Sequence, residues 1–148
     1  MAGVHLQIDV SDAVLRQALG RLAAAGGNMR LAFLDMGEHL LISHDRRFRE
    51  QVDPDGTPWE ALSERYRKRK KRNKDRILYL DGYLADHLRY QASPDHLAFG
   101  TNRVYGATQH FGDADRGIPA RPWLGLSAAD EAALLAIAAR HLNMTVSG

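Results

Sequence analysis

A dense cluster of positive charge at residues 65–76 constrains how this chain folds more than any other feature. The twelve residues RYRKRKKRNKDR hold nine of the chain's twenty Lys and Arg residues and one acidic residue, Asp75, so the segment carries 9 − 1 = +8. Like charges at this density repel one another and remain in water, so the segment cannot enter a core. The rest of the chain has 11 basic and 17 acidic residues, or −6. We therefore expect a mildly acidic body that carries one basic arm.

The length of 148 residues and the hydrophobic content of 45% predict one folded domain over residues 1–148. A chain of this size buries roughly two-thirds of its surface, which is enough for a hydrophobic core without disulfides or structural metals. The absence of cysteine excludes disulfides, a thiol nucleophile and any cysteine-ligated metal. No apolar run approaches the ~20 residues of a membrane span. The first ten residues also lack the pattern of a signal peptide, so we expect a soluble, cytoplasmic product.

The first half of the chain has a strand pattern followed by two helix patterns. Apolar and polar residues alternate over 4–10, which predicts a half-buried strand. Ser11 is a helix cap for a segment of about 12–25, which Gly26 and Gly27 end. Asn28 begins a second predicted helix that runs to about Gln51. Its apolar face has the spacing 4, 3, 4 over Met29, Phe33, Met36 and Leu40. A glycine within it, Gly37, favours a bend or break.

The middle of the chain is predicted to turn, form a short helix and then a hairpin. Residues 53–58 are dense in Asp, Pro and Gly, which is typical of a turn. Residues 77–88 predict a short helix interrupted by Gly82. Alternating apolar residues over 88–92 and 97–99 flank Ser-Pro-Asp and predict a β-hairpin.

The last third is predicted to hold a helical turn, a strand and a helix. The helical turn covers residues 104–112 and ends at Gly112, and a polar loop at 113–117 leads to a short strand at 118–124. Ser127 and Asp130 form a capping-box pattern that opens a helix to about Leu142. Because helices precede an antiparallel hairpin and no βαβ alternation occurs, the predicted fold class is α+β, with a small antiparallel or mixed sheet flanked by helices.

No pattern in the sequence predicts catalysis, a metal site or a cofactor. His39 and His44 are five residues apart and point about 140° apart on a helix, so they do not converge. Asp53, Asp55 and Gly56 lack the distal glutamate of a calcium loop. Phosphate-cradling loops, nucleophile elbows and dinucleotide fingerprints are also missing. We expect no catalytic or metal-binding residues and structural or surface roles for the seven histidines: His5, His39, His44, His87, His96, His110 and His141.

The basic arm has two interpretations. In the first it is a solvated loop that has no partner. In the second its cations bind phosphates or an acidic partner protein, without reading sequence. Tyr66 is the arm's one aromatic residue, so there is no ladder for stacking bases, and any nucleic-acid binding is expected to be nonspecific and salt-sensitive. The candidate contact residues are Arg65, Arg67, Lys68, Arg69, Lys70, Lys71, Arg72, Lys74 and Arg76.

A series of motifs from Phe48 to Ser127 resembles the phage virion morphogenesis family, the tail-completion proteins of Mu-like and related tailed phages. It begins as F-x4-D-P-D-G-x2-W-x2-L-S, continues through Ile77-Leu78 and the segment 105–112, and ends as P-A-R-P-W-L-G-L-S at 119–127. The resemblance marks twelve residues as core or subunit-interface positions: Asp53, Pro54, Gly56, Trp59, Gly82, Tyr105, His110, Phe111, Gly112, Arg121, Pro122 and Trp123.

Three positions depart from the family pattern. Gln109-His110 stands in swapped order, Gly106 replaces a commoner alanine, and Trp123 replaces the usual phenylalanine. For Trp59 and Trp123 we favour core packing over direct partner contact. Arg121, held between prolines, is a candidate for an intersubunit ion pair or a buried hydrogen-bonded anchor.

The resemblance implies a non-enzymatic structural protein that completes the head-proximal end of a tail and permits head–tail joining. The implied partners are copies of itself in an oligomeric ring, the tail tube and head-connector proteins, with no membrane and no cofactor. In a ring the basic arms would meet DNA if they face the tail channel, and acidic partner proteins if they face outward. The implied location is the virion tail, and the host cytoplasm during assembly. The alternative hypothesis is a small nonspecific nucleic-acid-binding module that acts through residues 65–76. That alternative explains the charge but not the Trp59 and Arg121 motifs.

Overall fold

The computed structural model of the chain describes residues 13–60, 87–101 and 104–147. The predicted strand at 4–10, most of the predicted helix at 77–88, Gly82 and the basic arm lie outside the described residues. The described elements confirm an α+β fold, with helices and one antiparallel hairpin. In chain order they are α1 (Ala13–Ala24), α2 (Met29–Glu50), β1 (Arg89–Ala92), β2 (Leu97–Gly100), α4 (Val104–Phe111), the 3-10 turn η2 (Ala114–Arg116) and α5 (Ala128–Ser147).

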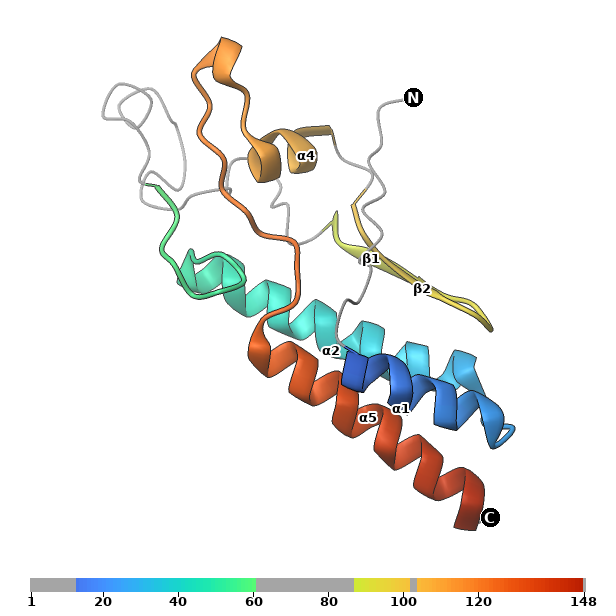
Figure 1. Cartoon of the computed structure of the whole chain (residues 1–148). Coiled ribbons are helices and arrows are strands. Elements are labelled where there is room, and N and C mark those ends of the chain that lie inside the picture. Colours follow the sequence, from blue (N-terminus) through green and yellow to red (C-terminus); the bar gives the residue numbers. More distant parts are fainter. Residues whose placement is uncertain (1–12, 61–86, 102–103, 148) are drawn as a thin grey trace.

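Helix α2 contacts both helix α5 and the β-hairpin. It packs against α5, which also holds α1, and it contacts both strands of the hairpin (Figure 1). After α4 the chain runs out to η2 and then returns to the start of α5 (Figure 1). We call the returning residues 118–127 the extended segment. None of the described helices is long and apolar enough to cross a membrane.

The predicted C-terminal end of α1 and both predicted ends of α2 are confirmed, and each has a local cause. The predicted cap Ser11 lies outside the described residues. Gly26 has a positive φ of 79°, a conformation that glycine adopts without strain, and it ends α1. The Asn28 side chain accepts a hydrogen bond of 3.2 Å from the backbone N–H of Leu31 and caps α2. At the other end Gln51 has a φ of 57° and donates its N–H to the Arg47 carbonyl at 2.8 Å.

Helix α2 runs through Gly37 without the predicted break. The reason is a close approach to the hairpin, because the Tyr90 ring of β1 lies on the bare backbone of Gly37. A Cβ at this position would overlap that ring. The Tyr90 hydroxyl also donates to Glu38 at 2.5 Å, which fixes the ring across the helix. Glycine here serves packing between helix and strand.

The predicted β-hairpin is confirmed. β1 and β2 pair antiparallel, with Tyr90 opposite Phe99 and Ala92 opposite Leu97. The Ser93 N–H donates to the His96 carbonyl at 2.9 Å and closes the turn. Phe99 is 3% exposed, so one face of the hairpin enters the core.

The predicted strand at 118–124 is wrong. The segment is extended, but its one β-bridge joins Ile118 to Asp113 within the same loop. Pro119 and Pro122 have no N–H to offer a neighbouring strand. Three of the other N–H groups bond to α4 instead: Arg121 donates to the Gln109 carbonyl at 2.7 Å, and Trp123 and Leu124 donate to the His110 ring.

The predicted capping box at the start of α5 is confirmed. The Asp130 N–H donates to the Ser127 hydroxyl and the Ser127 N–H donates to the Asp130 carboxylate, both at 3.0 Å. α5 runs to Ser147, five residues beyond the predicted end at Leu142. In its last turns the Thr145 hydroxyl donates to the His141 carbonyl at 2.8 Å.

The buried apolar side chains form two clusters that meet along α2. One joins α2 to the hairpin and the extended segment through Leu40, Phe48, Trp59, Leu88, Phe99, Trp123 and Leu124. The other joins the three long helices through Leu15, Phe33, Met36, Leu134 and Ala138. The apolar face predicted from Met29 to Leu40 therefore faces the core.

Replacing Gly37 with alanine is expected to destabilise the fold by about 1–2 kcal/mol, because overpacking against Tyr90 exceeds the gain in helix propensity. Gly20 of α1 is the matched control, since a Cβ there meets nothing within 4 Å. Gly20→Ala is expected to stabilise by about 0.5–1 kcal/mol. Urea unfolding of both variants measures the difference, and equal shifts would contradict the close approach.

Candidate functional site

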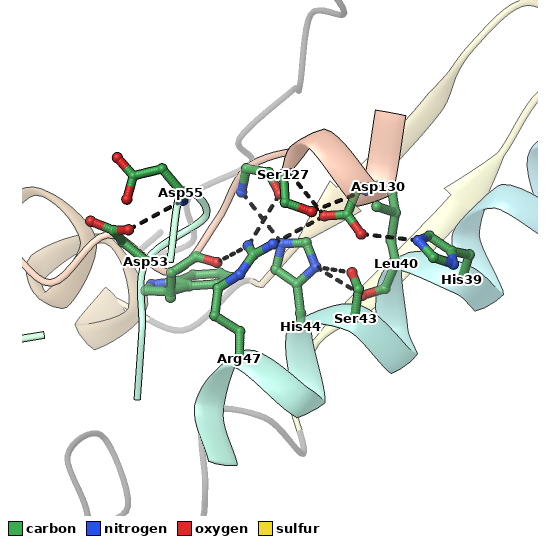
Figure 2. Close-up of polar contacts among 11 residues, drawn as sticks. His39, Leu40, Ser43, His44, Arg47, Asp53, Asp55, Ser127 and Asp130 are labelled. Atoms are coloured by element: carbon green, nitrogen blue, oxygen red, sulfur yellow. Dashed lines mark hydrogen bonds and ion pairs between the residues drawn. The ribbon is translucent and has the colours of Figure 1, made fainter. Parts of the chain in front are cut away.

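Asp130, in the first turn of α5, is the centre of a buried polar cluster (Figure 2). It is 2% exposed, and its Oδ2 accepts hydrogen bonds of 3.0 Å from the Arg47 guanidinium and from the Ser127 N–H. Its Oδ1 lies 2.9 Å from His39 Nε2. Burial opposes ionisation of this carboxyl, but the bonds from Ser127, His39 and Ser43 and the charge of Arg47 outweigh it and lower its pKa below the usual range.

Arg47 connects Asp130 to the chain before α5. It is 5% exposed and sits on the core side of α2. One guanidinium nitrogen donates to the carbonyls of Trp123 at 2.6 Å and Gly125 at 3.1 Å, and the other donates to Asp130. One side chain therefore ties together α2, the extended segment and α5.

His44 lies beside this ion pair and is fully buried. Its Nδ1 donates to the Leu40 carbonyl at 2.8 Å, and its Nε2 accepts the Gly125 N–H at 3.3 Å. Both bonds fit the neutral ring, since a second ring proton would point at the Gly125 N–H. Burial, followed by the charge of Arg47, lowers the pKa of His44 to about 3.

The two tryptophans marked by the resemblance are buried next to this centre. Trp59 is 6% exposed and its Nε1 donates to the Pro122 carbonyl at 2.7 Å. Trp123 is fully buried and its Nε1 donates to the Gly106 carbonyl at 2.8 Å. The Phe48 ring lies 5.6 Å from the Trp59 ring and 5.7 Å from the Trp123 ring. Both side chains are core residues whose polar ends are satisfied.

Arg121 is also buried, at 5% exposed. Its Nε donates to the Glu60 carbonyl at 2.7 Å, and its backbone N–H donates to Gln109. The structure therefore places it as an anchor between the extended segment, the end of the 53–60 region and α4. An intersubunit ion pair for this residue remains a prediction.

The end of α4 places three marked residues in different environments: His110, Phe111 and the following Gly112. His110 Nδ1 accepts the N–H groups of Trp123 and Leu124, both at 3.3 Å, and burial lowers its pKa. Phe111 points outward and is 62% exposed. Gly112 has a φ of 76°, and a Cβ there would lie 2.7 Å from the Ala120 N. Only glycine fits at that position without strain.

The Asp53–Pro58 turn is closed by its own carboxylates. Asp53 Oδ1 accepts the N–H of Thr57 at 2.9 Å and that of Asp55 at 3.2 Å. Gly56 supplies a φ of 92°. Pro54 lies against Gly125, where an added Cβ would be 3.0 Å from the proline Cγ. The turn therefore packs on the same extended segment that Arg47 holds.

A surface pocket of about 260 Å³ opens beside the ion pair, between α2, this turn and the start of α5. Ile42, Val52, Pro54 and Ala129 give it apolar walls, while His39, Ser43 and Asp130 reach it from the polar cluster. Among the described residues, no group of three or more His, Cys, Asp or Glu side chains is placed to hold a metal ion.

The structure brings most of the marked residues to one region and separates others. Trp59, His110, Arg121, Pro122 and Trp123 all bond to or within the extended segment. Phe111 stands apart on the surface, and Tyr105 lies in α4. The nine cations of the arm and Gly82 lie outside the described residues.

Sequence reasoning missed Arg47, gave His39 and His44 only a structural or surface role, and saw Asp130 only as a helix cap. A signal was present, because the 4, 3, 4 spacing of the apolar face of α2 continues through positions 44 and 47. A histidine and an arginine on a buried stripe indicate polar partners across the core.

The polar groups of this cluster bond to one another, which is the arrangement of a structural centre. Comparison with known proteins agrees: residues 10–143 match the model of the phage virion morphogenesis family, and the chain belongs to this family. The chain is thus a structural protein of phage assembly.

A relative in Escherichia phage Mu bears the name "Putative capsid assembly protein G". The chain is similar to it, with 31% identity over 106 residues, which cover 65% of this chain and 68% of the Mu protein. No solved structure matches.

Replacing Asp130 with alanine is expected to cost about 3–5 kcal/mol, because Arg47 would keep a buried charge with no counter-ion. Asp35 is the matched control: its carboxylate also pairs with an arginine and a histidine, Arg140 and His141, but it is 46% exposed. Asp35→Ala is expected to cost less than about 1 kcal/mol. Chemical denaturation of both variants checks this, and similar losses would contradict a buried pair.

His44 predicts a pH dependence of stability. Its folded pKa of about 3 lies below the ordinary 6.5, so the unfolded chain binds more protons between these values. The contribution of the neutral His44 ring to the free energy of unfolding is complete above about pH 6.5 and is lost as the pH falls toward 3.

In His44→Gln, whose amide retains a donor and an acceptor, the drop in unfolding free energy from about pH 7 to about pH 5 is expected to be about 2 kcal/mol smaller than in the parent. Urea titrations at both pH values measure it. An unchanged drop would show that His44 is not held neutral.

Proposed function

We propose that this chain is a non-enzymatic structural protein that completes the head-proximal end of a phage tail and permits head–tail joining. The observation that carries the proposal is membership of the virion morphogenesis family over residues 10–143, together with the motifs between Phe48 and Ser127. In this proposal the chain acts as an oligomeric ring late in assembly and stays in the virion.

The family resemblance and the Mu relative are both consistent with a role at the junction between head and tail. The motifs resemble tail-completion proteins, whereas the name of the Mu relative refers to capsid assembly. A protein at the junction between head and tail contacts both structures, which supports the junction as the site of action. The proposed partners are the tail tube, head-connector proteins and further copies of the chain.

The internal structure supports a role in contact rather than chemistry. The carboxylate, guanidinium and imidazole groups around Asp130 are engaged in holding segments together. Large apolar side chains are also exposed on the described helices, and a partner in this proposal would cover some of them. These are Val14, Leu31, Ile42, Phe111, Met144 and Val146, each at least 49% exposed.

The basic arm supports DNA binding under two hypotheses. DNA binding is either a second role of the tail-completion protein or, in the alternative, the whole function of the chain. Nine cations within residues 65–76 neutralise phosphates regardless of base sequence. In a tail-completion protein they would meet DNA that passes through the channel. In the alternative, a small nucleic-acid-binding module, DNA binding through the arm is the entire function. Salt-sensitive DNA binding fits both hypotheses, so an assembly phenotype is needed to separate them.

The test is complementation of a lysate from the parent phage that lacks this gene. Purified protein is expected to restore infectious particles, because tails left incomplete can then join filled heads. Electron microscopy of the uncomplemented lysate should show separate heads and tails. Unjoined particles that remain unjoined after addition of folded protein would contradict the proposal and favour the nucleic-acid module.

Two charge variants place the arm in the same assay. Lys70, Lys71 and Arg72 changed to Gln remove three charges from the arm; Arg21, Arg30 and Arg49 changed to Gln remove three from exposed helix surfaces. If the arm contacts DNA, the first variant lowers the restored titre at least about tenfold and the second does not. Equal titres would show that the arm is a solvated loop.

A further inference from the structure

We draw no further inference here: the strongest candidate, the surface pocket between α2, the Asp53–Pro58 turn and the start of α5, has a mixed lining of cations, carboxylates and apolar side chains that selects no single kind of ligand, and nothing in the structure shows what covers it.

Discussion

The ion pair between Arg47 and Asp130 holds the described part of the fold together, because three separate stretches of chain meet on it. Placing two charges in a core costs several kcal/mol per ion, and this cost is offset only when every remaining donor and acceptor is satisfied. Here Arg47 also reaches two carbonyls of the extended segment, and Asp130 also receives bonds from His39 and the Ser127 backbone. His44 stays neutral beside them. Removing one member would strand its partner, so the cluster fixes how α2, the extended segment and α5 meet.

Local signals predicted much of this fold from the sequence. The Asn28 cap, the glycines after α1, the Ser127–Asp130 box and the turn between β1 and β2 each act over a few residues, and each was predicted correctly. The strand at 118–124 was wrong because the N–H groups of Arg121, Trp123 and Leu124 bond to α4, which alternation of apolar residues cannot reveal. Arg47 and Asp130 are 83 residues apart, so their pairing has no local signature. Arg121, by contrast, was marked by the family motif at 119–127 and by the two prolines that flank it.

The core holds the described segments of this phage assembly protein in place, and the surface carries its exposed apolar side chains. Inside, aromatic rings and bonded polar groups hold the turn, the extended segment and the helix ends in one arrangement. Outside, large apolar side chains such as Phe111 and Val146 are exposed on the described helices. The sequence adds nine cations within residues 65–76, the charge that the proposed contact with DNA requires.

Cryo-electron microscopy of finished particles tests the central claim most directly. Particles purified from the parent phage, with the chain carrying a small tag at its exposed α5 end, would be imaged with and without a tag-specific antibody fragment. The account predicts that the added density appears at one level, between the tail tube and the head, as a ring of equivalent copies. Density spread through the capsid shell, or a chain absent from finished particles, would contradict it.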